Sequence, residues 1–325
     1  MTTIAVDAMG GDHAPLEVIR GSIDASRSGS DVILVGNEGL IRPLLDRFDS
    51  EIPVVHAAEV IGMDQDASRA LRDKRDASVL VAARLVADGE ASGLVSAGST
   101  GATLAAAAFI IGRLPGVSRP AIASIFPTSE VVIDIGANID VRPEHLFEFA
   151  IMGSAVAEVY NDLNKPRVGL LNIGAEPGKG RPLERVAFEL LDETKAVNFV
   201  GNVEGTDLGR DRADVFVTDG FTGNILLKTG EGAAKAIFRL LLESMQADEY
   251  QEPLAKLVPA FMELRQQIDP EHTGGAHLVG TEGVVVIAHG SSSHRAVENA
   301  IKMAVEGVDR GLVDRIASGL DAAGQ

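Results

Sequence analysis

Short apolar runs alternate along this chain with segments of helical spacing. Each run is rich in β-branched residues and ends near Gly, Asp or Asn, which is typical of a strand that leads into a turn. The runs are TIAVDAM (3–9), DVILVGN (31–37), PVVHAAE (53–59), GLVSAGS (93–99), AIASIFP (121–127), VVIDIGAN (131–138), RVGLLNIG (167–174), NFVGNVE (198–204), DVFVTDG (214–220) and VVVIAHG (284–290). Few of them alternate apolar with polar residues, so we expect strands buried on both faces of a mostly parallel sheet.

The segments between the runs predict helices, most clearly residues 16–26 and 78–89. Strands that alternate with helices indicate a doubly wound α/β fold. The two runs on either side of Pro127–Ser129 have no helix between them and predict a hairpin or edge pair. We therefore expect a single α/β enzyme spanning residues 1–325, with two lobes and a soft boundary near residues 115–130.

A pair of helices is expected at residues 224–268, from Asn224 to about Met245 and from about Glu249 to Ile268. The second carries an apolar stripe that includes Leu254, Leu257, Val258 and Phe261. The stripe has two interpretations. The helical hairpin packs on the core or on a second subunit, or it protrudes and touches a membrane, with apolar burial as the driving force because a basic face is missing.

Composition and charge narrow the function classes. The 325 residues carry a formal net charge of -18 and include no Cys. Nucleic-acid binding needs a basic surface, so nucleic acid is not an expected partner. A disulfide and a thiolate nucleophile are excluded. The start of the chain lacks a signal-peptide pattern, and the most apolar run, residues 103–112, is about half of the ~20 residues that a membrane span needs. We expect a cytoplasmic protein.

Glycine-rich polar loops follow six of the predicted strands. They are DAMGGDHAP, SAGSTGA, DIGANID, NIGAEPGKG, TDGFTGN and AHGSSSH. Ligands in open α/β sheets bind beyond the carboxyl ends of the strands. The loops therefore predict one shared cleft rimmed by backbone N–H groups, hydroxyls, amides and a few cations.

Known nucleotide and metal motifs do not fit these loops. The adjacent glycines of AMGGDHAP break the dinucleotide fingerprint, and GAEPGKG is one residue too short for a Walker A loop. No HExxH motif occurs among the seven His residues, so no zinc site is expected. The lysine of GAEPGKG, Lys179, can still bind phosphate together with backbone N–H groups.

The segment DGFTGNILLK (219–228) predicts an anion site at a helix start. Asn224 and Lys228 are four residues apart and share one helical face. A helix N-terminus attracts anions through its free N–H groups and its dipole. Gly223, Asn224 and Lys228 are therefore expected to bind phosphate together.

Taken in order, several of these segments resemble one family. The segments are AVDAMGGD, VSAGSTGA, IDIGANID, FAIMGS, LLNIGAEPGKG, GNVEG, DGFTGNILLK and AHGSSS. They resemble the bacterial phosphate acyltransferases (acyl-ACP:phosphate transacylases) from Ile4 to about Arg310. The sequence departs from the family pattern at Ser99, where Asn is usual, at Ile287, where Lys is common, and at Thr273, where Tyr is usual.

The resemblance implies a fold like that of isopropylmalate dehydrogenase and phosphotransacetylase. It also implies transfer of a fatty acyl group from acyl carrier protein to inorganic phosphate, which gives acyl phosphate for phospholipid synthesis by a membrane glycerol-3-phosphate acyltransferase. A homodimer that associates peripherally with the inner face of the cell membrane is implied as well. No cofactor is expected.

Phosphate is itself the nucleophile in this reaction, so the absence of Cys is compatible with it. The protein must hold a dianion beside a thioester carbonyl and stabilise an oxyanion. The residues assigned to substrate binding are Gly10, Gly11, Ser96, Ser99, Thr100, Lys179, Gly223, Asn224 and Lys228, and the catalytic candidates are His289, Asn138 and Asp7. His289 could protonate the leaving thiolate or make only a structural hydrogen bond.

Two acids flank the first glycine turn, Asp7 and Asp12. We expect them to cap backbone donors and to orient Lys179 and Lys228, because carboxylates near cations usually pair. The alternative is that Asp7 binds Mg²⁺ or acts as a base toward phosphate.

Acyl carrier protein is acidic, and so is this chain, so docking needs a local basic patch. The densest cluster is Arg69, Arg72, Lys74 and Arg75. Its alternative is a solvated helix with local ion pairs. Two rival functions also stay open: a phosphotransacetylase-like enzyme that uses acyl-CoA, and a non-catalytic anion-binding protein. A nicotinamide-dependent dehydrogenase shares the fold, but no dinucleotide loop supports it.

Overall fold

The computed structural model describes residues 2–245, 256–264 and 274–324. Within these residues a single sheet holds eleven strands in the order β3-β2-β1-β4-β11-β10-β5-β6-β9-β7-β8. The strands are β1 Thr3–Asp7, β2 Asp31–Gly36, β3 Val54–His56, β4 Gly93–Ser96, β5 Ala121–Ile125, β6 Val131–Ile133, β7 Arg167–Leu171, β8 Asn198–Val203, β9 Val215–Val217, β10 Ala276–Val279 and β11 Val284–Ile287. Each predicted run contains a strand. Only β10 was not predicted, because its four residues are bounded by glycines and include His277.

Two antiparallel strands in the middle of the sheet divide it. The predicted hairpin around Pro127–Ser129 joins β5 to β6, and its turn is closed by the Phe126 N–H, which donates to the Glu130 carbonyl at 2.8 Å. β10 is antiparallel to both β5 and β11. As a result β1, β4 and β11 run in one direction, whereas β6, β9 and β7 run in the other. The hairpin therefore lies at the centre of the sheet and not at its edge.

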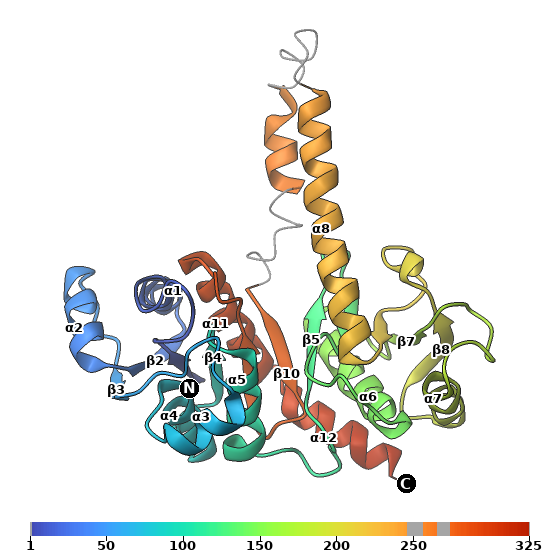
Figure 1. Cartoon of the computed structure of the whole chain (residues 1–325), viewed down its shortest axis with the longest axis horizontal. Helices are drawn as coiled ribbons and strands as arrows, with labels where there is room; N and C mark the ends of the chain where they lie inside the picture. Colours follow the sequence, from blue (N-terminus) through green and yellow to red (C-terminus); the bar gives the residue numbers. More distant parts are fainter. Residues whose placement is uncertain (1, 246–255, 265–273, 325) are drawn as a thin grey trace.

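Helices cover both faces of the sheet, as a doubly wound fold requires (Figure 1). On one face pack α3 Ala67–Asp73, α4 Ser78–Ala87, α5 Thr100–Ala106 with its π-helical extension Ala107–Ile111, and the first half of α8 Gly220–Ser244. On the other face pack α1 Leu16–Arg27, α2 Glu38–Arg47, α6 Pro143–Tyr160, α7 Pro182–Glu193, α11 His294–Asp309 and α12 Leu312–Ala323. The buried strand residues alternate between these two layers, which explains the unbroken apolar runs.

A helical hairpin projects from the body of the protein, as in the second of the two interpretations of its sequence (Figure 1). Its long arm is α8, and residues 256–264 form a second helix beside the outer half of α8. The rings of Phe238 and Phe261 meet edge to face with centroids 6.5 Å apart. Ile237 and Leu240 on α8 stay 66% and 56% exposed. The predicted membrane contact at Leu254 and the expected helix end at residue 268 lie outside the described residues.

The start of α8 differs from the expectation. The helix begins at Gly220, four residues before Asn224, because the Asp219 carboxylate caps it by accepting the Thr222 N–H at 2.8 Å. Across the described ranges, no helix combines the length and the apolar character that a membrane span requires.

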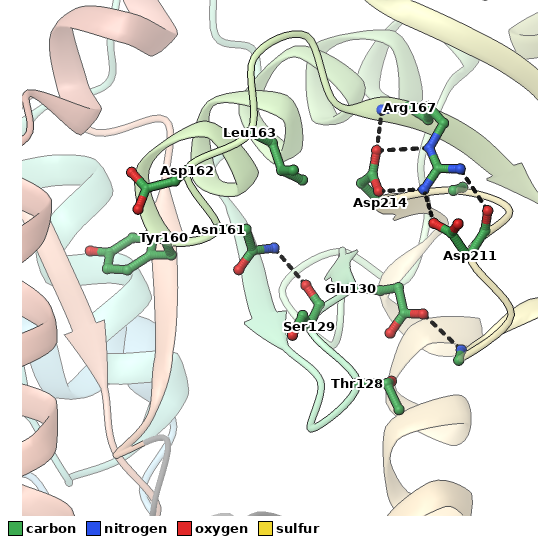
Figure 2. Close-up of a pocket in the computed structure, with 12 residues that line it drawn as sticks. Thr128, Ser129, Glu130, Tyr160, Asn161, Asp162, Leu163, Arg167, Asp211 and Asp214 are labelled. Carbon is green, nitrogen blue, oxygen red and sulfur yellow. Dashed lines mark hydrogen bonds and ion pairs between the residues drawn. The ribbon is translucent and has the colours of Figure 1, made fainter.

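A polar hollow of about 580 Å³ opens where β6, β7 and β9 begin (Figure 2). Glu130, Arg167 and Asp214 line it, and each stands at or just before the first residue of one of these strands. Since ligand sites of such folds lie beyond the carboxyl ends of the strands, this hollow is separate from the predicted loops.

Candidate functional site

The six glycine-rich loops form two sets, one on each half of the sheet. The first loop set, residues 7–12, 96–100 and 288–292, follows β1, β4 and β11. The second loop set, residues 134–138, 172–181 and 218–224, follows β6, β7 and β9. The strands before the first set and those before the second set run in opposite directions within the sheet. No hydrogen bond or ion pair joins one set to the other within the described residues.

The first loop set is tightly packed around Asp7. Its Ser96 hydroxyl donates to Asp7 Oδ2 at 2.7 Å, and the Gly98 N–H donates to Ser96 Oγ at 3.1 Å. A Cβ atom on Gly10 would lie 2.6 Å from Asp7 Oδ2 and 2.7 Å from the Gly98 nitrogen. Only glycine fits this contact. The strand-end acid thus holds the first glycine turn against the loop that follows β4.

Asp7 caps nearby donors, which is one part of its predicted role, and no ion pair joins it to a lysine among the described residues. Asp7 is 3% exposed and accepts hydrogen bonds from Ser96 and from the Met9 N–H at 3.3 Å. Burial raises the pKa of Asp7, and hydrogen bonds from Ser78, Ser96 and the backbone oppose this effect. Lys179 and Lys228 belong to the other half of the sheet, so Asp7 caps donors without orienting either cation. Asp12 is exposed and bonds through its N–H to the Gly290 carbonyl at 2.7 Å.

Ser96 also has a different role from the one assigned to it. A hydroxyl carries a single proton, and Ser96 donates it to Asp7. It therefore cannot donate to a phosphate or an oxyanion at the same time. Ser96 positions the loop and does not bind substrate directly.

The start of α5 offers free backbone donors. The first N–H groups of a helix have no intrahelical acceptor, and the Ser99 side chain makes no capping hydrogen bond. Thr100, the first residue of the helix, is exposed. Gly11 lies beside this turn, since a Cβ there would be 3.3 Å from Ala97. Gly10, Gly11, Ser99 and Thr100 are therefore brought together, as predicted, at an uncapped helix start that suits an anion.

His289 is exposed at the rim of the same set. Its Nδ1 accepts the Ser291 N–H at 3.3 Å and lies 2.8 Å from Ser291 Oγ. An N–H can donate only to an unprotonated nitrogen, so in the neutral ring the proton sits on Nε2. His289 thus presents an N–H donor at the rim, which can hydrogen-bond to an anion or to a leaving sulfur.

The basic helix α3 borders this first loop set. A Cβ on Gly101 would lie 3.3 Å from the Ala67 side chain, so the starts of α3 and α5 are in contact. Arg69 is exposed and pairs with Asp73 at 3.3 Å. Arg72 and Arg75 are exposed as well. The predicted carrier-docking cluster is thereby placed beside the candidate anion site.

Lys74 does not belong to that exposed cluster. Its ammonium donates to the Val60 carbonyl at 2.5 Å and to Gln65 Oε1 at 2.9 Å. These bonds fasten the loop after β3, whose Met63 reaches Gly290 in the first loop set. Lys74 therefore holds the local fold and has little capacity left for a partner.

The second loop set is organised by Asp134, a residue that the sequence did not single out. Its buried carboxylate accepts five N–H groups at 2.7 to 3.1 Å, from the backbone of Ile122, Gly136, Ala137 and Asn138 and from the Asn138 side chain. Burial raises the pKa of Asp134, and these donors oppose the rise. The signal in the sequence was an acid directly after a β-branched run, as at Asp7.

The oxyanion role predicted for Asn138 is contradicted by this arrangement. Asn138 is 7% exposed. Its amide donates to the Pro120 carbonyl at 2.8 Å and to Asp134 at 2.9 Å. An amide nitrogen has two protons, and both are used. Asn138 therefore fixes the loop.

Most donors at the start of α8, where an anion site was predicted, make local hydrogen bonds. The Gly220 N–H donates to the Asn138 carbonyl, and the Gly223 N–H donates to the Asp219 carbonyl. A Cβ on Gly223 would come within 1.9 Å of the Asp134 carbonyl, which shows how closely this turn packs. The Asn224 amide donates to the Ile135 carbonyl at 3.2 Å. A carboxylate at the cap, Asp219, further disfavours phosphate.

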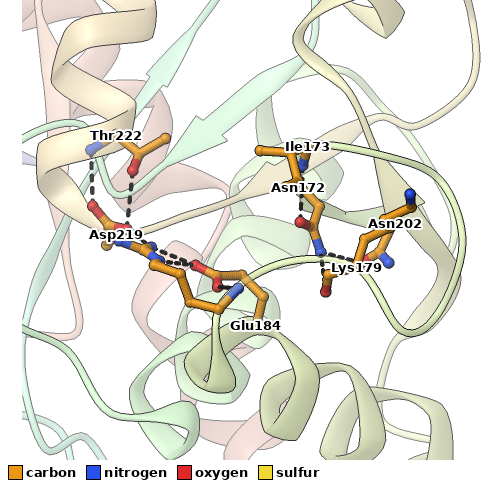
Figure 3. A network of polar contacts seen from close by, with 8 residues as sticks. Asn172, Ile173, Lys179, Glu184, Asn202, Asp219 and Thr222 are labelled. Carbon is orange, nitrogen blue, oxygen red and sulfur yellow. Dashed lines mark hydrogen bonds and ion pairs between the residues drawn. The ribbon is translucent and has the colours of Figure 1, made fainter.

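Arg181, which the sequence pattern missed, links α7 to the start of α8 through Glu184 and Asp219, both labelled in Figure 3. Its guanidinium bonds to Glu184 and, at 2.6 Å, to Asp219 Oδ2. Nearby, the Asn172 amide bonds to the Asn202 side chain and to the Lys179 carbonyl, both at 3.2 Å. The position of Arg181 directly before Pro182 at the start of α7 was the one available signal.

The two lysines assigned to phosphate point to local carboxylates. Lys228 is paired with Glu231 at 3.1 Å, and Lys179 lies 3.8 Å from Glu176. Both side chains are about half exposed, at 49% and 48%. The structure thus gives no convergence of Lys179, Lys228 and Asn224 on one anion. Among the described residues no group of three or more His, Asp or Glu side chains could hold a metal ion.

The chain is similar to known proteins over almost its whole length. The family model described as "Fatty acid synthesis protein" matches residues 2–315. A phosphate acyltransferase of Desulforamulus reducens is 45% identical, covering 99% of this chain and 98% of that protein. A phosphate acyltransferase of Anoxybacillus flavithermus is 43% identical, covering 96% and 97%.

Solved structures share the fold. A phosphotransacetylase from Streptococcus pyogenes superimposes with a TM-score of 0.63 at 19% identity, covering 95% of this chain and 94% of that one. A 4-hydroxythreonine-4-phosphate dehydrogenase from Klebsiella pneumoniae gives 0.54 at 13% identity, covering 94% and 100%. The fold of this chain is therefore similar to those of a phosphotransacetylase and a dehydrogenase. On the full-length family match, this chain belongs to the fatty acid synthesis protein family, together with relatives named phosphate acyltransferase.

Proposed function

We propose that this protein is a phosphate acyltransferase that moves a fatty acyl group from acyl carrier protein to inorganic phosphate. The observation that carries the proposal is the 43–45% identity, over almost the whole chain, to relatives of that name. The acyl phosphate formed would supply phospholipid synthesis through a membrane glycerol-3-phosphate acyltransferase.

The first loop set is proposed as the phosphate site. An uncapped start of α5, a glycine turn pressed against it and an exposed His289 all lie there. In the reaction, a phosphate oxygen attacks the thioester carbonyl, the C–S bond breaks and the thiolate takes up a proton. Backbone N–H groups near Thr100 and Gly11 would hold the anion, and the His289 Nε2–H would donate a hydrogen bond to the leaving thiolate, which takes its proton from water. No metal ion is needed for any of these steps.

Acyl carrier protein is proposed to dock on α3, through the exposed side chains of Arg69, Arg72 and Arg75. The support is position and charge: α3 touches the start of α5, and the chain is strongly acidic elsewhere. An acidic partner would be steered to this helix and kept away from most of the remaining surface. The thioester arm would then reach the first loop set directly.

The helical hairpin is proposed to contact the inner face of the cell membrane in a homodimeric enzyme. Leu257, Val258 and Met262 on the short helix are 46–49% exposed, and Ile237 and Leu240 on α8 are 66% and 56% exposed. Exposed apolar area of this kind is usually covered by lipid or by another protein chain. Burial of the stripe against the second subunit is the other outcome that a test must distinguish.

The direct test is an assay for acyl phosphate. Purified protein is incubated with phosphate and either acyl carrier protein thioester or acyl-CoA, and acyl phosphate is trapped with hydroxylamine while the released thiol is counted. We expect phosphate-dependent product, with the carrier protein as the better donor. A preference for acyl-CoA would favour a phosphotransacetylase-like enzyme, to which the fold is similar. Phosphate binding without product from either donor would indicate a non-catalytic anion-binding protein.

A further inference from the structure

The hollow at the start of β6, β7 and β9 is chemically distinct from the proposed phosphate site. Four of the residues that line it carry carboxylates, and Arg167 is its single cationic residue among those described. The acids are Glu130, Asp162, Asp211 and Asp214. The acyl-transfer reaction gives this edge of the sheet no role.

Arg167 cannot recruit an anion into the hollow. Its Nε donates to Asp214 at 3.1 Å, one Nη donates to the second Asp214 oxygen at 2.7 Å, and the other Nη donates to the Asp211 carbonyl at 2.6 Å. Figure 2 shows the guanidinium turned toward these two acids. The positive charge is therefore used inside the wall. Asp162 pairs with Arg310, so Glu130 is the one acid of the four without a cationic partner among the described residues.

Glu130 is the acid that has a carboxylate oxygen without a hydrogen-bond donor. It is 6% exposed, and one carboxylate oxygen, Oε1, accepts the Gly209 N–H at 2.7 Å. The other oxygen, Oε2, is buried and has no hydrogen-bond partner among the described residues. A buried carboxylate oxygen without a donor is costly, and a cation with N–H groups would satisfy it.

The remaining walls favour an organic cation. Leu163, Ala213 and the Tyr160 ring contribute apolar surface, while Thr128 and Ser129 add oxygen acceptors near Glu130. A bound metal ion fits poorly, since no cluster of three candidate ligands exists in the described part of the chain. An ammonium group on a short methylene chain matches both the acids and the apolar wall.

We infer that this hollow binds an aliphatic polyamine, with one ammonium group on Glu130 and the methylene chain along Leu163 and Tyr160. The site lies at the edge where β6 begins, away from the carboxyl ends of that strand and its neighbours. Its occupancy is independent of whether the enzyme transfers acyl groups.

The test is calorimetric titration of the full chain with spermidine at about 0.15 M salt, where weak surface attraction is screened. We expect saturable binding to the natural protein. Glu130→Gln keeps an acceptor for Gly209 but removes the charge, and should weaken binding by about tenfold or more. Glu38→Gln removes the same charge from α2 at the other end of the sheet and should bind as the natural protein does.

A second variant guards against misfolding of the Glu130 substitution. Thr128 is exposed in the β5–β6 turn, so Thr128→Phe should fill the mouth of the hollow without disturbing the core, and it should abolish binding. Absence of saturable binding to the natural protein would overturn the inference. So would an equal loss in the Glu130 and Glu38 variants, because binding would then reflect only the net charge.

Discussion

At the scale of single residues, the strand-end acids hold loops together. Asp7 and Asp134 end different strands, yet both are buried and both accept several hydrogen bonds from the loop that follows. The sequence showed each acid beside glycines but not the direction in which its carboxylate points. The hydrogen-bond acceptors of the Ser96 and Asn138 side chains could not be predicted from the sequence either, because the packing of the folded chain determines which acceptor lies beside each donor.

Asp7→Asn tests the positioning role of the first acid. The amide presents N–H protons where Asp7 now accepts hydrogen bonds, so the Gly10 turn should loosen at a cost of about 1–3 kcal/mol in unfolding free energy. We expect a higher KM for phosphate with a smaller change in kcat. Kinetics are measured with added Mg²⁺ and with EDTA. If EDTA lowers the activity of the natural protein but not that of the Asp7→Asn variant, the result would instead assign a metal ion to Asp7.

Lys228→Ala tests whether Lys228 on α8 takes part in phosphate binding. The lysine is half exposed and paired with Glu231, and exposed pairs of this kind contribute little. We therefore expect the KM for phosphate to stay within about twofold of the natural value, since an interaction of under ~0.5 kcal/mol changes an equilibrium by no more. A large rise in KM would return Lys228 to the phosphate site.

At the scale of elements, the proposed docking of acyl carrier protein depends on the position of α3 beside α5 as well as on the positive charge of α3. Arg69→Glu with Arg72→Glu should lower kcat/KM for acyl carrier protein thioester by about tenfold or more at low salt, with a weaker effect at high salt. The KM for phosphate should not change. Arg42→Glu with Arg47→Glu on α2 makes the same change of charge and is the matched control. An equal effect of both substitutions would show general repulsion and would place docking elsewhere.

The proposed membrane contact of the helical hairpin can be tested separately. Leu257→Asp with Val258→Asp places charge on the exposed apolar stripe of the short helix. We expect co-sedimentation with anionic lipid vesicles to fall strongly, because charged side chains cost several kcal/mol in the membrane interior. Acyl transfer in solution and the oligomeric state should stay as they are. Dissociation of the oligomer with unchanged vesicle binding would show that the stripe packs against the second subunit.

At the scale of the whole molecule, β10 joins the two halves of the sheet and contributes a buried histidine. His277 is 1% exposed, neither ring nitrogen has a hydrogen-bond partner among the described residues, and its ring lies 4.6 Å from that of Tyr160. Burial lowers the pKa of His277 from 6.5 to about 3. The unfolded chain binds a proton below pH 6.5 whereas the folded chain does not, so acid favours unfolding.

Stability should therefore decline as pH falls from 6.5 toward 3. The contribution of this one residue is at most about 1.4 kcal/mol per pH unit. His277→Leu should flatten the pH dependence of the unfolding free energy in that range, as measured by urea titration at several pH values. His13→Leu, on an exposed loop, is the control. Equal slopes for His277→Leu and the natural protein would contradict the buried neutral state.

The local pattern determined most of the architecture. β-branched runs, capping acids and glycine turns are read within a few residues, so ten strands, the central hairpin and the projecting helices could all be predicted. The ordered motifs also indicated the family. β10 was not predicted, because its four residues between glycines are too short a run to show a strand pattern.

Only the tertiary structure decided which loops meet. The reversal at β5, β6 and β10 divides six similar loops into two sets, and no local pattern contains that information because it depends on strand pairing between distant segments. The same long-range packing turned Asn138, Ser96 and Lys74 inward and left the start of α5 uncapped. Residue type and spacing thus set the kinds of group present, whereas the sheet topology set which of them can act on one ligand.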